Sequence, residues 1–286
     1  MIIYIIKKYN LKQILLLRLT YDKLYPKSNF FTDLDSNLSL SVQFCNLVTS
    51  LFMDPVDIDC IEFKKIIDKI SNDSRIMIEA ITLNPFWYNQ RLIKGYFELY
   101  NKDLKKEIYK EFPENMRDAL ITCLNTKRND INKEIDLEEI NEKVKLLINT
   151  NPEEILKNNE IFLNIFALPS PKELIMISRI YKEKKGDNLL SLIENKLNEE
   201  ESMFLKEVIF NVCRPSENFA YKLRDSIKGV KVDTNTINRI LVMRNEIDMK
   251  EIRTFYQKLN NEDLDKDISN IFHGAYKNLL LYLYSK

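Results

Sequence analysis

The residues that could perform enzymatic or metal chemistry are few and stand far apart. His273 is the single histidine, so a Ser-His-Asp triad or a zinc site would have to be built around it. It precedes Gly274 at the expected start of a helix, where a role beside the helix cap is the simpler interpretation. The four glycines are well separated and form neither a G-x-x-x-x-G-K nor a G-x-G-x-x-G phosphate loop. The sequence therefore predicts that this protein is not an enzyme.

The cysteines likewise form no pattern typical of a metal site or a redox centre. Cys45, Cys60, Cys123 and Cys213 include no C-x-x-C pair, and three of them stand in apolar runs with helical spacing. We interpret them as reduced core cysteines of an intracellular protein.

Charge and composition narrow the function classes further. The chain has 43 basic and 43 acidic residues, so no global field attracts it to polyanions, which argues against a nucleic-acid binder of the basic-stripe kind. Only 4 glycines and 8 prolines in 286 residues leave few turns, while the 45% hydrophobic fraction is ample for a large core. One extended helical array is expected.

The last quarter of the chain shows the pattern most clearly. Apolar residues recur there at helical spacing in five short bursts, each bounded by a cap or stop signal such as Lys228-Gly229. The five predicted helices are Phe219–Ile227, Ile237–Met243, Ile247–Leu259, Leu264–Ile271 and Tyr276–Tyr284. Such a unit of about 65 to 70 residues is too small to be the whole protein, which suggests a repeat.

This stretch resembles the last repeat of an annexin, whose usual sequence motif is K-G-x-G-T-D-x-x-x-x-x-R-x-x-x-x-R-x-E-x-D-x-x-x-I-R. The positions that fit are Lys228, Gly229, Asp233, Arg239, Arg244, Glu246, Asp248, Ile252 and Arg253. The resemblance implies an all-α fold: an annexin-like array of four five-helix repeats, the first incomplete, forming a curved disc that meets membranes on its convex side.

On this resemblance we divide the chain into repeats of 1–54, 55–126, 140–214 and 215–286, with a charged linker at 127–139. The first copy begins with helices expected at Ile2–Lys8 and Leu11–Leu24, followed by Phe30–Asn37 and Val42–Phe52. It therefore lacks its first helix, and an apolar stripe should be exposed there. The first helices of the second and third copies are expected at Ile61–Ile70 and around Val144–Ile148.

The resemblance also implies calcium-dependent phospholipid binding. In annexins a G-x-G-T loop between the first and second helices offers carbonyl oxygens, and a carboxylate before the fifth helix completes the site. In the fourth copy Gly229 keeps the first glycine, but Lys231 and Val232 follow it and Ile271 replaces the acid. Glu111 keeps the acid in the second copy, whose loop reads Lys69-Ile70-Ser71-Asn72-Asp73 without glycine.

The third copy has Ile155-Leu156-Lys157-Asn158 in the loop and Lys196 near the acid position. Calcium is therefore the only cofactor implied, held weakly or lost, with Glu111 and Gly229 as the candidate metal residues. Because Lys69, Lys157 and Lys231 stand where annexins place calcium, they could meet the phosphate groups of an anionic phospholipid membrane directly.

Two further groups of residues have alternative interpretations. Phe86, Trp87 and Tyr88 are either a patch for a protein partner or self-association, or a staple that fixes the start of a helix. Arg239, Arg244, Glu246 and Asp248 resemble the charged groups at the polar centre of annexins, and we interpret them as a structural ion-pair network.

The sequence thus predicts a cytoplasmic, peripheral membrane-binding protein of the annexin type with calcium binding weak or lost. The alternative is a calcium-independent protein-binding scaffold.

Overall fold

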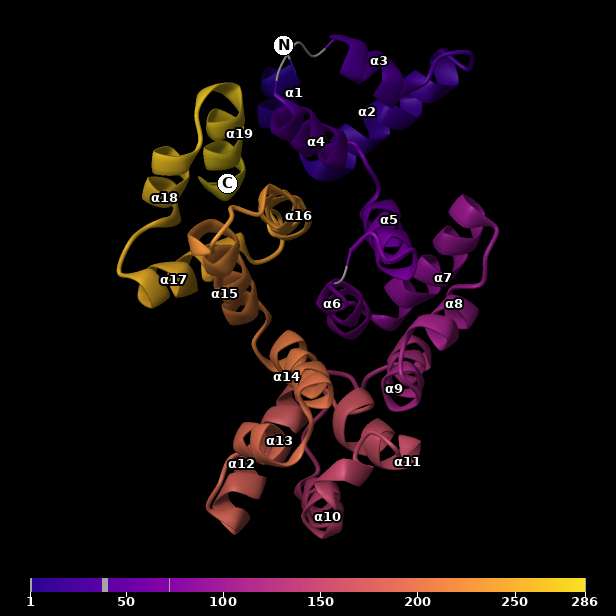
Figure 1. Cartoon of the computed structure of the whole chain (residues 1–286), viewed down its shortest axis with the longest axis vertical. Coiled ribbons are helices and arrows are strands. Elements are labelled where there is room, and N and C mark those ends of the chain that lie inside the picture. Colours follow the sequence, from indigo (N-terminus) through magenta and orange to yellow (C-terminus); the bar gives the residue numbers. More distant parts are fainter. Residues whose placement is uncertain (1, 38–40, 72, 286) are drawn as a thin grey trace. The chain divides into compact units, whose positions relative to one another are not determined.

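The computed structural model describes residues 2–37, 41–71 and 73–285. Within these ranges the chain forms nineteen α-helices and no strand (Figure 1), so the all-α prediction is confirmed. No single helix in the described part has the length and apolar character needed to cross a bilayer. One bent pair, Asn159–Ala167 with Pro171–Lys185, meets those criteria only when its two halves are taken together.

The chain divides into two compact units, Met1–Ile58 with Ser216–Lys286, and Asp59–Pro215. The first unit therefore brings together residues from the two ends of the sequence. The Leu11 N–H donates to Glu246 Oε1 at 3.0 Å, and the Tyr282 hydroxyl donates to the carbonyl oxygen of Lys7 at 3.0 Å. Periodicity within a short window carries no information about these pairings, because their partners are separated by more than 200 residues.

The helices of the first unit lie within a few residues of the predicted bounds. They are α1 (Ile2–Lys8), α2 (Leu11–Leu24), α3 (Phe30–Asn37), α4 (Val42–Leu51), α15 (Pro215–Lys228), α16 (Thr234–Arg244), α17 (Met249–Asn260), α18 (Leu264–Ile271) and α19 (Gly274–Ser285). Caps explain several of the boundaries. At α2, for example, Asn10 and Gln13 form a reciprocal capping box.

Helix α2 carries a group of exposed leucines. Ile14 is the buried residue of this helix, whereas Leu16, Leu17, Leu19 and Leu24 are all exposed. An exposed leucine is ordinary, but four on one fourteen-residue helix form an uncovered apolar surface.

The second unit contains most of α5 (Pro55–Ile67) and then α6 (Arg75–Leu83), α7 (Phe86–Tyr100), α8 (Leu104–Glu111), α9 (Glu114–Asn125), α10 (Leu137–Asn149), the 3-10 turn η1 (Pro152–Glu154), α11 (Asn159–Phe162), the π-helical turn η2 (Leu163–Ala167), α12 (Pro171–Lys185), α13 (Leu189–Lys196) and α14 (Glu199–Cys213). Its core includes the stacked rings of Phe162 and Phe166, whose centroids are 5.8 Å apart, with Phe204 beside them.

Two helices of this unit begin earlier than predicted. α5 starts at Pro55 rather than Ile61, and α10 starts at Leu137 rather than Val144, inside the stretch that we assigned to the linker. The Asp136 side chain accepts from the backbone N–H groups of Glu138 and Glu139, so an N-cap fixes the start of α10. The first turn of α10 carries two acids, and near the start of α5 the buried residues Val56, Ile58 and Cys60 are spaced by two, so neither start shows the apolar period of a helix.

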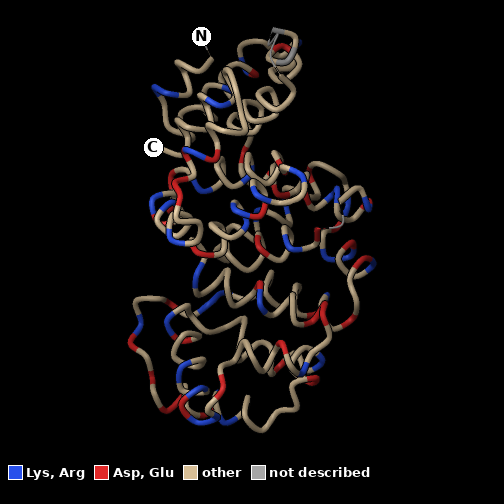
Figure 2. The backbone as a smooth tube through the Cα atoms, turned by 60° about the vertical axis from the view of Figure 1, so that its left-hand side comes forward, with Lys and Arg blue, Asp and Glu red and all other residues tan. Residues whose placement is uncertain are grey.

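Charged residues of both signs are interspersed along the chain (Figure 2). This distribution agrees with the balanced composition and leaves individual loops, rather than a global field, as the candidates for charge recognition.

Candidate functional site

The loop between α5 and α6 brings a lysine to the acid that the sequence singled out. Lys69 adopts a left-handed backbone conformation with φ of 58°, at the position that aligns with Gly229 in the fourth copy. Its ammonium group lies 3.7 Å from Oε2 of Glu111 at the end of α8. The backbone N–H groups of Ile70 and Ser71 both donate to the carbonyl oxygen of Lys65, which ties this loop to α5. Asn72, the next loop residue, lies outside the described residues.

The loop between α15 and α16 has another arrangement. Gly229 does not adopt a left-handed conformation. A Cβ at this position would lie 2.5 Å from the carbonyl oxygen of Asp225, so any larger residue would clash with the backbone there. Lys228 Nζ lies 3.3 Å from Asp267 Oδ2. Lys231 is exposed and makes no ion pair within the part of the chain that the structure describes. Ile271 stands at the acid position, and its hydrocarbon side chain offers no oxygen ligand.

Two apolar residues at the tips of these loops were missed by the sequence analysis. Val230 has a relative exposure of 113% and Ile70 one of 76%, the two largest values among the exposed apolar side chains of the described residues. Each follows the first-glycine position directly, as Lys69-Ile70 and Gly229-Val230-Lys231. The sequence analysis assigned Ile70 to the end of a helix, Ile61–Ile70, whereas α5 ends at Ile67 and leaves Ile70 in the loop. Val230 stands in a loop, for which helical periodicity carries no signal.

The third copy differs again. Ile155 and Leu156 are buried, so this loop has no apolar tip, and Lys157 extends from it with its ammonium group 3.9 Å from Glu154 Oε1. The segment is held by η1 and by Asn158, whose side chain accepts from the N–H groups of Glu160 and Ile161.

The described residues contain no group of three or more His, Cys, Asp or Glu side chains arranged to hold a metal ion. Glu111 and Gly229, the candidate metal residues, belong to different loops, and Glu111 faces the Lys69 ammonium group.

One turn before Glu111 in α8, Glu107 is a buried acid with two lysine partners. Lys110 Nζ donates to its Oε1 at 2.8 Å and Lys102 Nζ to its Oε2 at 3.3 Å. The hydrogen bond from Lys110, opposed by burial and reinforced by Lys102, lowers the pKa of Glu107.

We expect Glu107→Gln to destabilise the fold in a pH-dependent way. Because the folded-state pKa lies below the unfolded one, the stabilisation is present above the ordinary Glu range and is lost as pH falls through the folded pKa. Since both lysines are largely exposed, the cost at neutral pH should be about 1 kcal/mol, shrinking in acid. Urea midpoints measured over a pH series test this. Glu98→Gln, on an exposed pair with Lys94, is the matched control and should show almost no effect. An equal loss for Glu107→Gln at every pH would contradict the explanation.

The aromatic run at the start of α7 is split between surface and core. Trp87 is 60% exposed and Phe86 is partly exposed, whereas Tyr88 is buried, and its hydroxyl group donates to Asp59 Oδ2 at 2.7 Å. Tyr88 therefore takes no part in a surface patch, and only Phe86 and Trp87 remain candidates for contact with a partner.

The predicted polar network is partly assembled within the first unit. Arg244 donates through Nε and Nη2 to the two carboxylate oxygens of Asp248, both at 2.8 Å, and Ser216 Oγ donates to Asp248 Oδ2 at 2.7 Å. Glu246 accepts from the Leu11 N–H, and Arg239 is buried. These contacts suit the interpretation of a structural network.

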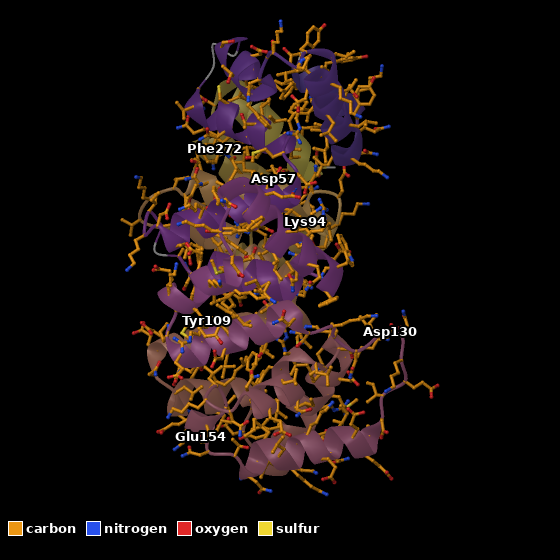
Figure 3. All side chains as sticks on the ribbon, turned by 90° about the vertical axis from the view of Figure 1, so that its right-hand side faces the viewer. Asp57, Lys94, Tyr109, Asp130, Glu154 and Phe272 are labelled. Carbon is orange, nitrogen blue, oxygen red and sulfur yellow. The ribbon has the colours of Figure 1, made fainter. Side chains whose placement is uncertain are left out.

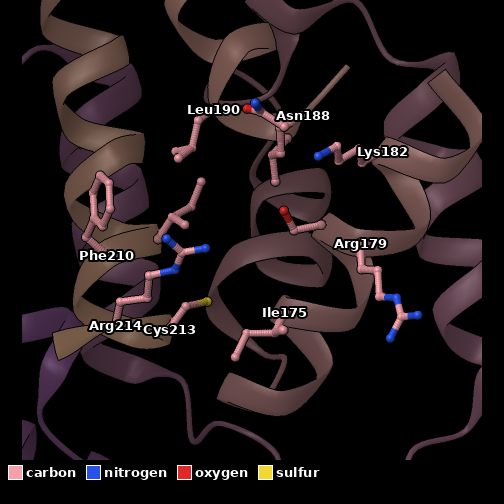
Figure 4. Close-up of a pocket in the computed structure, with 11 residues that line it drawn as sticks. Ile175, Arg179, Lys182, Asn188, Leu190, Phe210, Cys213 and Arg214 are labelled. Atoms are coloured by element: carbon pink, nitrogen blue, oxygen red, sulfur yellow. The ribbon is translucent and has the colours of Figure 1, made fainter. Parts of the chain in front are cut away.

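A cavity of about 450 Å³ lies among α12, α13 and α14, where Cys213 and Arg214 face Ile175 (Figure 4). Burial raises the pKa of the Cys213 thiol to about 11, and that of Cys123 likewise to about 11. Both thiols are therefore protonated and poorly nucleophilic near neutral pH. His273 is exposed beside Gly274, which has φ of 64°.

Comparison with known sequences extends the resemblance. The sequence model of the annexin family matches residues 218–283. Over 246 residues the chain is 27% identical to annexin A3 of Bos taurus, an alignment that covers 85% of this chain and 75% of that protein.

Solved structures share the fold. The structure of annexin III superposes with a TM-score of 0.89 at 24% identity, covering 100% of this chain and 87% of that one. The structure of calcium-bound annexin (Sm)1 gives a TM-score of 0.85 at 20% identity, covering 100% and 84%. The fold is therefore the helical repeat fold of the annexins.

Proposed function

The chain belongs to the annexin family, and from this premise we propose that it is a peripheral protein of anionic phospholipid membranes that binds them with little or no use of calcium. The family typically binds phospholipid in a calcium-dependent way. The observation that carries our more specific proposal is the pairing, in two loops, of a lysine with a highly exposed aliphatic residue: Lys69 with Ile70, and Lys231 with Val230.

This pairing suits the surface of a bilayer. A lysine close to an anionic leaflet contributes about 1 kcal/mol of attraction. An aliphatic side chain that leaves water for the interface adds up to about 1.5 to 3 kcal/mol when it is fully buried. A loop tip that offers both can bind headgroup and acyl chain together, whereas either contribution alone is weak.

The same loops are poorly suited to calcium. The ion requires about six to eight oxygen ligands, usually with more than one carboxylate. In the second copy Glu111 is the acid at the expected position, and the nearby ammonium group of Lys69 repels a divalent cation. In the fourth copy the acid position is Ile271. We infer that Lys69 substitutes for the ion by neutralising Glu111, and that any residual calcium affinity is weak.

The rest of the assignment follows the family. We propose a cytoplasmic, peripheral membrane location, no catalytic activity, and four repeats at 1–54, 55–126, 140–214 and 215–286. The predicted linker, 127–139, then shares its last three residues with α10.

A protein-binding scaffold is the second candidate, favoured by the exposed leucines of α2. A lipid-binding protein does not need this stripe, whereas a protein partner could cover it.

Co-sedimentation with phosphatidylserine vesicles separates these functions. We expect equal binding in millimolar calcium and in chelator, and weaker binding as salt rises, because salt screens exposed charges over about 10 Å at 0.1 M. Phosphatidylcholine vesicles are the control and should sediment little protein. Strictly calcium-dependent binding would overturn the calcium-independent mechanism, and no binding under any condition would leave the scaffold function.

A further inference from the structure

A second cavity lies in the unit Asp59–Pro215, at the end of α6 and α9 remote from the loops. Its volume is about 610 Å³, within the range of pockets that bind small ligands or single peptide side chains. Trp87 and Ile131 present exposed apolar surface to it, and Lys127 and Arg128 supply positive charge. None of the residues lining it is acidic.

Asn89 gives this cavity a specific polar requirement. Its side chain is only 2% exposed, and its Nδ2 group donates to the carbonyl oxygens of Ile81 at 3.0 Å and Cys123 at 3.5 Å. These two acceptors fix the orientation of the amide, because the reversed amide would place Oδ1 against two carbonyl oxygens. Oδ1 is buried and has no donor within hydrogen-bonding reach among the described residues. Asn89 lines the cavity, and an occupant whose N–H group reached this oxygen would satisfy it.

The charge at the cavity is likewise uncompensated. Arg128 Nη1 donates to the carbonyl oxygens of Phe166 at 2.7 Å and Pro169 at 3.0 Å, which positions the guanidinium group without neutralising it. Neither Arg128 nor Lys127 forms an ion pair with a carboxylate in the described ranges. Two cations next to an apolar surface attract an anionic group attached to an apolar one.

We propose that this cavity binds a short acidic peptide segment of a partner protein. An apolar side chain of the segment packs against Trp87 and Ile131, a carboxylate meets Arg128 and Lys127, and a backbone N–H donates to Asn89 Oδ1. A peptide supplies these three groups at once, since every residue carries an N–H beside its side chain. Tryptophan and arginine are also among the residue types that contribute most to binding at protein interfaces.

The position of the cavity leaves it accessible while the loops meet a membrane. α6 runs from the Lys69 loop to the cavity, and α9 runs from beside Glu111 to the cavity. With a rise of about 1.5 Å per residue these helices span about 14 and 18 Å. Within this unit, Tyr109 and Glu154 on the loop side lie across from Asp130, which adjoins the cavity-lining Asn129 (Figure 3). The protein could therefore hold a partner and a membrane at the same time.

Trp87 provides a direct measurement, because it is the only tryptophan in the chain and lines the cavity. The probe is the capped peptide Asp-Glu-Leu-Phe-Asp-Glu, and its control is the same peptide with Asn and Gln in place of the acids. Added to the full chain without lipid, the acidic peptide should cause a saturable blue shift of the fluorescence and bind about tenfold more tightly than its amide control. Equal affinities for the two peptides, or no shift, would overturn the proposal.

A variant of Lys127 tests the role of positive charge at the cavity. Lys127→Glu, at an exposed residue, should weaken the acidic peptide about five- to tenfold, whereas Lys12→Glu, at an exposed lysine of the other unit, should leave the affinity unchanged. If phenylbutyrate binds as tightly as the peptide, the occupant is a small carboxylate and the peptide assignment is wrong.

Repeating the titration with vesicle-bound protein should reproduce the affinity. A blue shift caused by vesicles alone would instead place lipid at this cavity, which would also overturn the proposal. Because the first titration contains no lipid, it can fail or succeed independently of membrane binding.

Discussion

Reversing the charge of the three loop lysines, by Lys69→Glu, Lys157→Glu and Lys231→Glu together, should reduce the affinity for phosphatidylserine vesicles by about 100-fold or more. Each lysine near an anionic surface contributes about 1 kcal/mol, and three lost contributions multiply to about this factor before repulsion is added. Vesicle co-sedimentation in chelator, over a lipid titration, measures the loss.

The three lysines should contribute unequally. Lys231 should matter most, because it is exposed, makes no ion pair within the described ranges and stands next to Val230. Lys69 and Lys157 lie 3.7 and 3.9 Å from Glu111 and Glu154, so part of their charge is already balanced. The single variants should therefore rank with Lys231→Glu as the weakest binder.

The control for the triple variant has the same change in net charge on helices instead of loops. Lys94→Glu, Lys145→Glu and Lys250→Glu alter exposed positions on α7, α10 and α17. If attraction comes from the loops, this variant should bind vesicles much better than the loop variant. Equal losses in the two variants would mean that net charge alone governs binding. Unchanged binding by the loop variant would remove the lysines from the mechanism.

The exposed aliphatic residues Ile70 and Val230 stand in two of the loops that are proposed to contact the membrane. Their exposure could not be deduced from the sequence, since an aliphatic residue in a five-residue loop can fold inward, as Ile155 and Leu156 do in the third copy. The structure separates two loops with apolar tips from one without. Membrane contact is thus expected to involve the loops of Ile70 and Val230 more than that of Lys157.

The sequence predicted the helices well because each has both an apolar period and a boundary signal. α18 has its predicted bounds, and so do α1, α2 and α3. Prediction failed at the first turns of α5 and α10. α10 is started by the Asp136 cap and two acids, and the apolar residues near the start of α5 are spaced by two, which is not the period of a helix.

The candidate site was only partly accessible from the sequence. The positions of Lys69 and Glu111 could be read from the annexin pattern, but their pairing depends on how α8 ends beside the α5–α6 loop. Similarly, the aromatic run suggested a patch of three residues, and only the fold shows that Tyr88 turns inward to Asp59 while Trp87 remains outside. The unsatisfied oxygen of Asn89 results from an amide that is oriented by the carbonyl oxygens of residues 81 and 123, and no local sequence motif predicts it.

The polar network of the first unit supports a second large effect, on stability. Asp248→Ala should lower the free energy of unfolding by about 3 kcal/mol, because it leaves the Arg244 guanidinium group nearly buried without its carboxylate. Arg244 also lies over the Phe219 ring, 4.8 Å from its centroid, so its position is fixed from both sides and it cannot simply turn to solvent. Urea denaturation followed by far-UV circular dichroism gives the change in midpoint.

A double variant distinguishes an unpaired charge from lost packing. Arg244→Met combined with Asp248→Ala removes the charge together with its partner, so it should be less destabilised than Asp248→Ala alone. The Ser216 hydroxyl, which donates to Asp248, can meet water in either background and should not alter the order. If Asp248→Ala costs under about 1 kcal/mol, the pair behaves like a solvated surface ion pair and the network does not hold the first unit together. If the double variant is the less stable of the two, packing by the Arg244 side chain, rather than its charge, is what this part of the fold requires.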